Sequence, residues 1–373
     1  MSETALADQA AAPSTSEPGA VTPNQRRELR EALKAAGVFE RDPWRAWRKL
    51  VVLLVGVTAL LVAALSSPHP AGLALLLPAA VLLTAAAMLG HEGAHKSMAS
   101  SARHNAWMLH ITFPFMSGLG AHHWKWKHNQ LHHPHPNVPG VDFDLQMWPM
   151  ASYPAQAAGA GPVRRLFVQH LQMWLFWPLT ALLPYAMRLN SIRILLRKAR
   201  ADGVDRAVLL DGGCLLCHYT LWLVVPAQFV GLLPALGFYV LLWSMVGVLL
   251  SMVFAPAHMG MPVQPDHGDD WLAQLETTRN LLLPRWLSAL FIGLDRQVEH
   301  HLFPGVSHFQ LGQAAVITRQ WAQRHKLPYH EVGYWHGLVD ATLELGRVGR
   351  AVGAASSPQA RPTGLGDVPT VGA

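Results

Sequence analysis

Histidine is the residue type in this chain whose number and spacing could do chemistry. There are 21 His among 373 residues, and ten of them lie between residues 91 and 135. Two imidazoles at positions i and i+4 lie on one face of a helix, where they can clamp a metal ion. This spacing occurs twice, as His91 with His95 and as His128 with His132. The pattern predicts a metal site.

The candidate ligands are more numerous than one metal ion needs. A zinc protease uses three protein ligands, and burying many imidazoles without a metal would leave polar groups unsatisfied. The supply therefore suits two metal ions. Imidazole donors suit Fe, Zn or Cu, and the residues alone do not choose among these metals. The eight candidate ligands are His91, His95, His128, His132, His133, His258, His300 and His301.

The first pair also fits a different chemistry. His91-Glu92-Gly93-Ala94-His95 matches the H-E-x-x-H pattern of zinc proteases, in which Glu92 is the general base. Asp295 is then a possible third ligand. This alternative leaves the later histidine clusters unexplained.

The elements that carry these residues are predicted from hydropathy. Only 14% of the residues are charged, and residues 51–90 and 212–257 contain no Asp, Glu, Lys or Arg. Such runs exclude a soluble globular enzyme and predict an all-α polytopic membrane protein. We expect four transmembrane helices in two hairpins, at about residues 50–66, 71–90, 207–227 and 232–256.

The topology follows from the basic residues. Eight Lys and Arg between residues 26 and 49 precede the first span and predict a cytoplasmic N-terminus. Residues 166–187 are long enough to cross, but Pro178 and Pro184 interrupt them and a basic segment follows at 188–206. If this segment crossed, the histidine clusters would lie on opposite faces. We therefore expect 166–187 to stay at the surface, with every cluster on the cytoplasmic face.

The remaining segments complete the expected organisation. Residues 106–120 are too short to cross and favour an interfacial or re-entrant segment. Residues 1–40 are expected to form a flexible arm and a short helix, 41–350 the membrane domain, and 351–373 a disordered tail. Within the membrane domain, residues 258–350 are expected to form a cytoplasmic helical cap that holds a di-metal site. The first residues lack an apolar signal segment, so we expect an integral protein of the inner membrane with both termini cytoplasmic.

Three stretches carry a resemblance to a known family. They are HEGAH at 91–95, WKHNQLHH at 126–133 and QVEHHLFP at 297–304. In this order they resemble the three histidine boxes of the membrane fatty acid desaturases, and the likeness covers about residues 40–345. Gln297 in place of a histidine is the pattern of the acyl-lipid and front-end branch.

The resemblance implies a site and a reaction. It implies two non-haem Fe ions that activate O2 and, with two electrons, remove two hydrogens from an acyl chain to give a cis double bond. The eight histidines named above would be the ligands, and Gln297, Asn129 and Asn137 would ligate or support the ligands. Ala257 departs from the family, where Asn often precedes the histidine. The other histidines of the first clusters are expected to be structural or to support the ligands: His104, His110, His122, His123 and His135.

The resemblance also implies partners. The substrate would be an acyl lipid or acyl thioester, and membrane lipids rather than nucleic acid would surround the basic residues. His69-Pro70-Ala71-Gly72 is not a haem-binding H-P-G-G motif, so we expect a separate electron donor, a ferredoxin or a cytochrome with its reductase. An acidic donor or lipid headgroups would contact the basic residues Lys125, Lys127, Arg193, Arg197 and Lys198. Trp124, Trp126 and Trp148 would shape the mouth of an acyl tunnel or anchor the protein at the interface.

Other functions stay open at this point. A hydroxylase or ketolase acting on a lipid or a carotenoid would use the same boxes. The zinc protease and a non-enzymatic membrane haem or structural protein are further alternatives.

Overall fold

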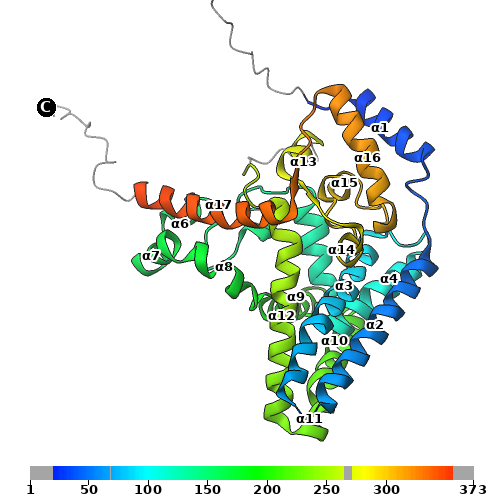
Figure 1. Cartoon of the computed structure of the whole chain (residues 1–373), viewed down its shortest axis with the longest axis vertical. Coiled ribbons are helices and arrows are strands. Elements are labelled where there is room, and N and C mark those ends of the chain that lie inside the picture. The colour runs from blue at the N-terminus through cyan, green and yellow to red at the C-terminus, as the bar shows by residue number, and fades with distance from the viewer. Residues whose placement is uncertain (1–19, 68, 264–270, 356–373) are drawn as a thin grey trace, which may run out of the picture.

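The chain folds as an all-α polytopic membrane protein. A computed structural model describes residues 20–67, 69–263 and 271–355. Figure 1 shows long helices at one end of the molecule and a group of shorter helices at the other. The predicted fold class is confirmed.

Four helices of the described residues are long and apolar enough to cross a membrane. They cover Pro43–Ser66, Pro70–His95, Arg206–Val230 and Leu232–His258, with 24 to 27 residues each. At 1.5 Å per residue they reach at least about 36 Å, more than the roughly 30 Å of a hydrocarbon core. The four predicted spans are confirmed, and the first begins earlier than expected, at Pro43 after the cap Asp42.

The spans pair as two hairpins. The first hairpin joins α2 (Pro43–Ser66) to the 3-10 turn η1 (Pro70–Leu75) and α3 (Leu76–His95). In the second, α10 (Arg206–Tyr219), the π-helical turn η5 (Thr220–Val224) and α11 (Val225–Val230) form one span, which returns as α12 (Leu232–His258). The turn between α11 and α12 lies at the end of the molecule far from the shorter helices (Figure 1).

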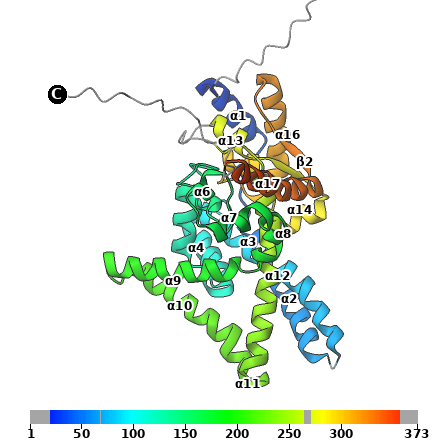
Figure 2. The same ribbon diagram turned by 90° about the vertical axis from the view of Figure 1, so that its left-hand side faces the viewer.

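The segment between the hairpins does not form a span. It consists of α7 (Pro162–His170), α8 (Gln172–Thr180) and α9 (Leu183–Asp202). Pro178 lies inside α8 and Pro184 begins the first turn of α9, so the apolar run is divided into short helices. Figure 2 shows α9 running across the direction of the spans. This agrees with the expectation that residues 166–187 stay at the surface.

Shorter elements connect the hairpins around the end of α3. Residues 106–120 contribute to α4 (Ala102–His110) and the π-helix η2 (Ile111–Ser117), which pack against α3. The chain continues through α5 (Ala121–Trp124), the π-helix η3 (Lys125–His132), the 3-10 turn η4 (Phe143–Leu145) and α6 (Ala155–Ala158).

The remaining elements form a cap over this end of the spans. We define the cap as α1 (Pro23–Ala35), α13 (Trp271–Thr277), β1 (Asn280–Leu282), α14 (Arg285–Leu290), α15 (Gln297–Leu302), α16 (His308–His325), β2 (Glu331–Gly333) and α17 (Tyr334–Ala355). The two short strands pair in parallel, with Asn280 opposite Glu331.

The described residues begin just before the first helix of the chain and end with the last. Thr22 caps α1 through a reciprocal hydrogen-bond pair with Gln25, as the Thr-Pro sequence predicts. At the other end α17 continues to Ala355, so the first five residues of the expected tail are helical. The expected arm before residue 20 and tail after residue 355 lie outside the described residues.

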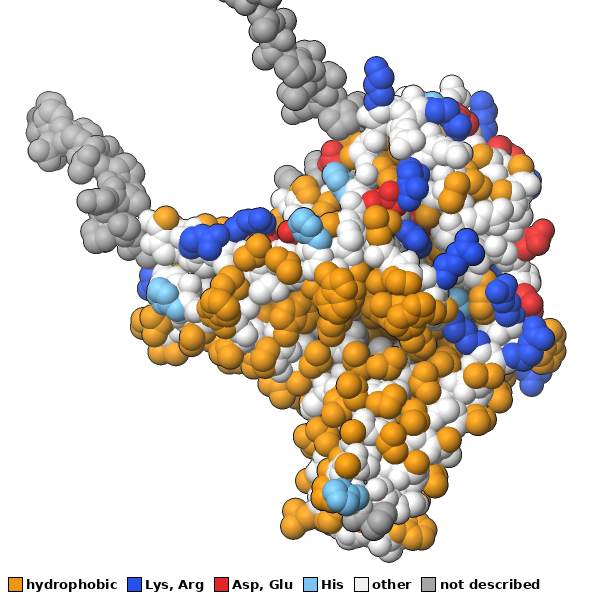
Figure 3. All heavy atoms as spheres, viewed as in Figure 1, with side chains coloured by type: hydrophobic (Ala, Val, Ile, Leu, Met, Phe, Trp, Pro, Cys, Tyr) orange, Lys and Arg blue, Asp and Glu red, His pale blue; other side chains and the backbone are white. Residues whose placement is uncertain are grey.

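The surface divides according to polarity. Figure 3 shows apolar side chains over the spans and along the underside of α17, whereas the charged side chains gather on the cap and beside the start of α2. Large apolar side chains are exposed on α8 and α17, among them Trp174 and Trp335. A surface of this size exposed to water would be unstable, so the membrane is expected to cover it.

Candidate metal centre

The first histidine pair lies at the end of the second span. α3 ends at His95 because Lys96 adopts a left-handed conformation with φ of 57°. His91 and His95 lie one turn apart, with ring centroids separated by 4.6 Å. Gly93 between them lets α4 approach closely, since a Cβ at this position would lie 2.6 Å from the Asn105 carbonyl oxygen. The pair is therefore held at a tight helix contact.

The second cluster lies on a π-helix. η3 runs from Lys125 to His132, and the backbone N–H of His133 donates to the His128 carbonyl at 3.0 Å, an i to i−5 bond. Such a wide turn places residues i, i+4 and i+5 on one side of the helix. His128, His132 and His133 consequently face the same space, and π-helical turns are frequent at functional sites.

The eight predicted ligands come together in two groups. Each group offers ring nitrogens that lie within 4.8 Å of one another. The five-histidine group contains His91, His95, His128, His133 and His300, and the three-histidine group contains His132, His258 and His301. The ligands of the two groups thus lie on α3, on η3 and His133 directly after it, on α12 and on α15.

The distances inside the five-histidine group fit a metal ion better than hydrogen bonds. His128 Nε2 lies 2.9 Å from His91 Nε2 and 3.1 Å from His133 Nε2, and His300 Nε2 lies 3.0 Å from His133 Nε2. A neutral imidazole has one donor and one acceptor, so it cannot hydrogen-bond twice through the same nitrogen. Neighbouring ligands about 2.1 Å from a metal and at right angles lie ~3.0 Å apart.

Unpartnered nitrogens and burial support the same fit. His95 Nε2, His301 Nε2 and both ring nitrogens of His258 are buried without a hydrogen-bond partner, which a metal ion would supply. Burial also lowers the pKa of His128, His133, His300 and His301 well below the ordinary value. These rings are therefore neutral, the form that binds metals. The residues fit two metal ions bound mainly by imidazole.

A second layer of polar groups orients two of the ligands. His132 Nδ1 lies 3.0 Å from Asp142 Oδ2. Burial by itself would lower the pKa of His132, but the Asp142 carboxylate outweighs burial, so the pKa is raised overall. His301 Nδ1 lies 3.0 Å from Gln274 Oε1, and Gln274 Nε2 donates to the His133 carbonyl at 2.8 Å. Such partners fix the tautomer and the direction of a metal-binding imidazole.

The three predicted amide residues surround the groups. Asn129 Nδ2 donates to the Ala94 carbonyl at 3.0 Å, which ties the first two clusters together. Asn137 Nδ2 donates to the His258 carbonyl at 3.1 Å. Gln297 is buried, and its Nε2 has no hydrogen-bond partner among the described residues. Whether any of them binds a metal stays a prediction.

The carboxylates of the protease alternative lie elsewhere. Glu92 Oε2 is 2.6 Å from His308 Nδ1 of α16, and Lys49 Nζ lies 3.1 Å from the other ring nitrogen of His308. Asp295 accepts a hydrogen bond from Ser288 Oγ at 2.8 Å. Asp295 belongs to no histidine group of the described chain, so it is not placed as the third ligand, and Glu92 is paired with His308 instead of facing the histidine groups as a free base.

The other histidines of the first clusters lie outside the two groups. His110 Nε2 is 3.5 Å from Asp211 of α10, and His123 Nδ1 is 2.9 Å from Ser191 Oγ of α9. Burial lowers the pKa of His123 to about 4. His104, His122 and His135 are likewise not members of either group as described. The sequence analysis missed the roles of His308 and Gln274, and no motif or spacing in the sequence marks them.

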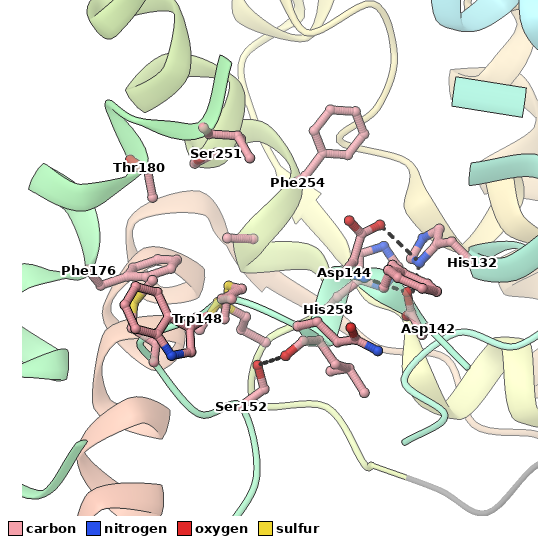
Figure 4. Close-up of a pocket in the computed structure, with 18 of the residues that line it drawn as sticks. His132, Asp142, Asp144, Trp148, Ser152, Phe176, Thr180, Ser251, Phe254 and His258 are labelled. Atoms are coloured by element: carbon pink, nitrogen blue, oxygen red, sulfur yellow. Dashed lines mark hydrogen bonds and ion pairs between the residues drawn. The ribbon is translucent and has the colours of Figure 1, made fainter. Parts of the chain in front are cut away.

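A cavity leads to the metal centre from the side of the molecule. It has a volume of about 340 Å³ and is lined mainly by apolar residues, with His128, His132 and His258 at one end. Figure 4 shows Phe176 and Trp148 across the cavity from His132. Trp124 and Trp148 line the cavity as expected, but Trp126 packs on Phe143 at 5.0 Å and is not among the lining residues.

A smaller cavity adjoins the large one. It has a volume of about 50 Å³, and its lining includes His91 and Trp243. The two cavities share four lining residues: Trp124, Met187, Leu250 and Phe254. Histidines of both groups therefore border this space, with His128, His132 and His258 on the large cavity and His91 on the small one.

Most of the chain is similar to known proteins. Residues 66–333 match the family model described as fatty acid desaturase. An acyl-lipid (9-3)-desaturase of Physcomitrium patens is 29% identical over 290 residues, 70% of this chain and 50% of that protein. An acyl-lipid (8-3)-desaturase of Thraustochytrium sp is 26% identical over 348 residues, 89% of this chain and 75% of that protein. A sn-1 linoleoyl-lipid 6-desaturase of Synechocystis sp. is 26% identical over 268 residues, 65% of this chain and 70% of that protein. The chain spans between half and three fifths of the length of several curated relatives.

Proposed function

The chain belongs to the fatty acid desaturase family, and on that premise we propose that it is an O2-dependent di-iron enzyme that introduces a cis double bond into the acyl chain of a membrane lipid. One observation carries the proposal. Six buried and two half-buried histidines form two groups at the inner end of an apolar cavity. An apolar substrate and an imidazole-bound metal pair would meet at this point.

Two bound iron ions would supply the activation of O2 and the removal of hydrogen from the acyl chain. The protein residues would bind these ions, exclude water and orient the ligands. Burial lowers the pKa of His128, His133, His300 and His301 and so favours the neutral form that binds metals. Trp124, Leu250 and Phe254 line both cavities and would keep water away from the reacting carbons, as a reactive oxidant requires. Asp142 and Gln274 would hold His132 and His301 in the orientation that binds the metal.

The cavity supports a lipid as the substrate rather than a soluble thioester. Leu182 and Ala186 on α8–α9 line its outer part and are themselves exposed, Leu182 to 58%. They continue into the apolar surface that the membrane is expected to cover. The acyl chain of a lipid would therefore enter the cavity from the bilayer, while the headgroup of that lipid stayed at the membrane interface.

Narrowing this opening is expected to slow the reaction without disturbing the metal centre. Ala186→Trp adds a large ring at an exposed position of the lining, so folding should be preserved. We expect the turnover of lipid substrate to fall at least about tenfold, equal to about 1.4 kcal/mol, with an unchanged metal content.

The matched control is Asn190→Trp, one helical turn further along the same exposed side of α9. Asn190 does not line the cavity, so this variant should keep wild-type turnover. Equal turnover of the two variants, measured by gas chromatography of the product esters, would contradict access at this opening.

The same proposal includes an electron donor and an orientation of the protein in the membrane. We propose a separate donor, a ferredoxin or a cytochrome with its reductase, that reaches the cap on the cytoplasmic side of the inner membrane. Of the predicted basic residues, Lys127 pairs with Asp144, and Lys198 pairs with Asp202 and Asp205. Arg193 and Arg197 of α9 are exposed beside apolar residues, which suits lipid headgroups better than a protein partner.

The experiment that tests the function is product analysis. The chain would be expressed in a host with a simple lipid profile, and the fatty-acid methyl esters would be analysed by gas chromatography with mass spectrometry. We expect a new ester two mass units lighter than its precursor. A product heavier by one oxygen atom would instead establish a hydroxylase or ketolase with the same site.

A further inference from the structure

The end of α12, which carries His258, needs hydrogen-bond donors from outside the helix. Pro256 lies inside the last turn and has no N–H, so the Met252 carbonyl loses its helical donor. Tyr334 Oη donates to this carbonyl at 3.3 Å. The last carbonyls of any helix also lack partners within it. The position of His258 therefore depends on what satisfies these groups.

Arg279 donates hydrogen bonds to most of the carbonyl groups at the end of α12. Its Nε donates to the Pro256 carbonyl at 2.7 Å, its backbone N–H to the Ala257 carbonyl at 3.1 Å, and its Nη2 to the Met259 carbonyl at 3.1 Å. The carbonyl between them, that of His258, accepts from Asn137 Nδ2 at 3.1 Å. Four consecutive carbonyls around the ligand are thus bound, three of them by one buried residue.

No side chain orients the ring of His258. Asp142 orients His132 and Gln274 orients His301, whereas the group that interacts with the His258 ring is the backbone of Thr277. Thr277 belongs to the same segment as Arg279. The direction of this imidazole is consequently set by the backbone from which it projects.

We propose that Arg279 is the positioning residue of the three-histidine group, where it holds the backbone of His258 so that the group can bind its metal ion. This inference rests on the proposed metal centre. The five-histidine group takes its ligands from α3, the η3 region and α15. Because the carbonyls bound by Arg279 at the end of α12 flank His258, a ligand of the three-histidine group only, the loss of Arg279 should empty that group and leave the other metal in place.

The test is the metal content of Arg279→Lys. Lysine keeps a positive charge for Asp340, which lies 3.0 Å from Arg279 Nη1, but it lacks the planar fork that reaches several carbonyls. The full chain would be purified in detergent, loaded with Co(II) and analysed by elemental mass spectrometry and absorption. We expect about one metal per chain in place of two, with metal affinity of the emptied group lowered about 10- to 100-fold.

Two further variants make the result specific. His258→Ala removes the ligand itself, so it should give the same one-metal protein and the same Co(II) spectrum as Arg279→Lys. Asp340→Asn removes the ion pair but no donor to the carbonyls around His258, so it should keep two metals. Circular dichroism and the elution volume should match the wild type in all three variants.

The outcomes separate this inference from the proposed function. An Arg279→Lys protein that keeps two metals would overturn the positioning role alone. The same holds if Arg279→Lys loses both metals while His258→Ala keeps one, or if Asp340→Asn loses one. A wild-type protein that binds no metal would overturn the metal centre itself and this inference with it.

Discussion

Replacing His128 with alanine is expected to abolish the formation of unsaturated product. His128 Nε2 lies between His91 and His133 in the five-histidine group, and the ring also borders the large cavity. A catalytic metal contributes several kcal/mol to the barrier, and each 1.4 kcal/mol is tenfold in rate. We therefore expect activity to fall at least about a thousandfold, as measured by gas chromatography of fatty-acid esters.

His123→Ala is the matched control for this variant. His123 is a buried histidine of the preceding helix α5, but it pairs with Ser191 and belongs to neither metal group. Its loss removes one hydrogen bond, which costs about 1 kcal/mol of stability, and should leave product formation within a few fold of wild type. Product formation by His128→Ala would show that this residue is not a ligand.

Removing the Asp142 carboxylate is expected to have the second-largest effect. Asp142 lies beside His132 and accepts hydrogen bonds from the backbone N–H groups of Asn137 and Asp144, both at 2.9 Å. Burial opposes ionisation, but His132 and these hydrogen bonds lower the pKa of Asp142 overall. A hydrogen bond to a charged group typically contributes about 1.5–3 kcal/mol of stability, and Asp142 accepts several.

The expected result for Asp142→Ala is a protein that melts at lower temperature and binds the metal of the three-histidine group about 10- to 100-fold more weakly. Thermal unfolding in detergent and metal titration would measure the two effects. Asp144→Ala is the comparison variant. Asp144 also lies near His132 Nδ1, at 3.3 Å, and could hold a metal ion together with His128 and His132, but its side chain is 42% exposed. Equal effects of the two variants would contradict the special role of Asp142.

The spans were predictable because the signal for them is local. Two long runs without charge are enough to fix four helices, and Pro178 with Pro184 explains why the apolar segment between the hairpins does not become a fifth. The start of the first span was placed several residues late. α2 already begins at Pro43, since Asp42 caps it and the long side chains of its first turns can reach toward polar surroundings.

The candidate ligands were predictable as a set but not in their grouping. Spacing along one helix indicates which histidines share a face, and all eight predicted residues belong to the two groups. The division into five and three depends on how α12 and α15 meet η3, a contact between segments more than 100 residues apart. The sequence also did not reveal His308 beside Glu92, Gln274 beside His301, or Arg279 at the end of α12, because each contact depends on how separate elements of the cap pack and no local spacing marks it.

The metal content of the purified wild-type chain tests the central claim most directly. The chain would be expressed in iron-supplied medium, purified in detergent and analysed by elemental mass spectrometry against its measured protein concentration. The account predicts two iron ions per chain, one for each histidine group. One zinc ion per chain with no iron would contradict it, because a single zinc site leaves one of the two groups without a function.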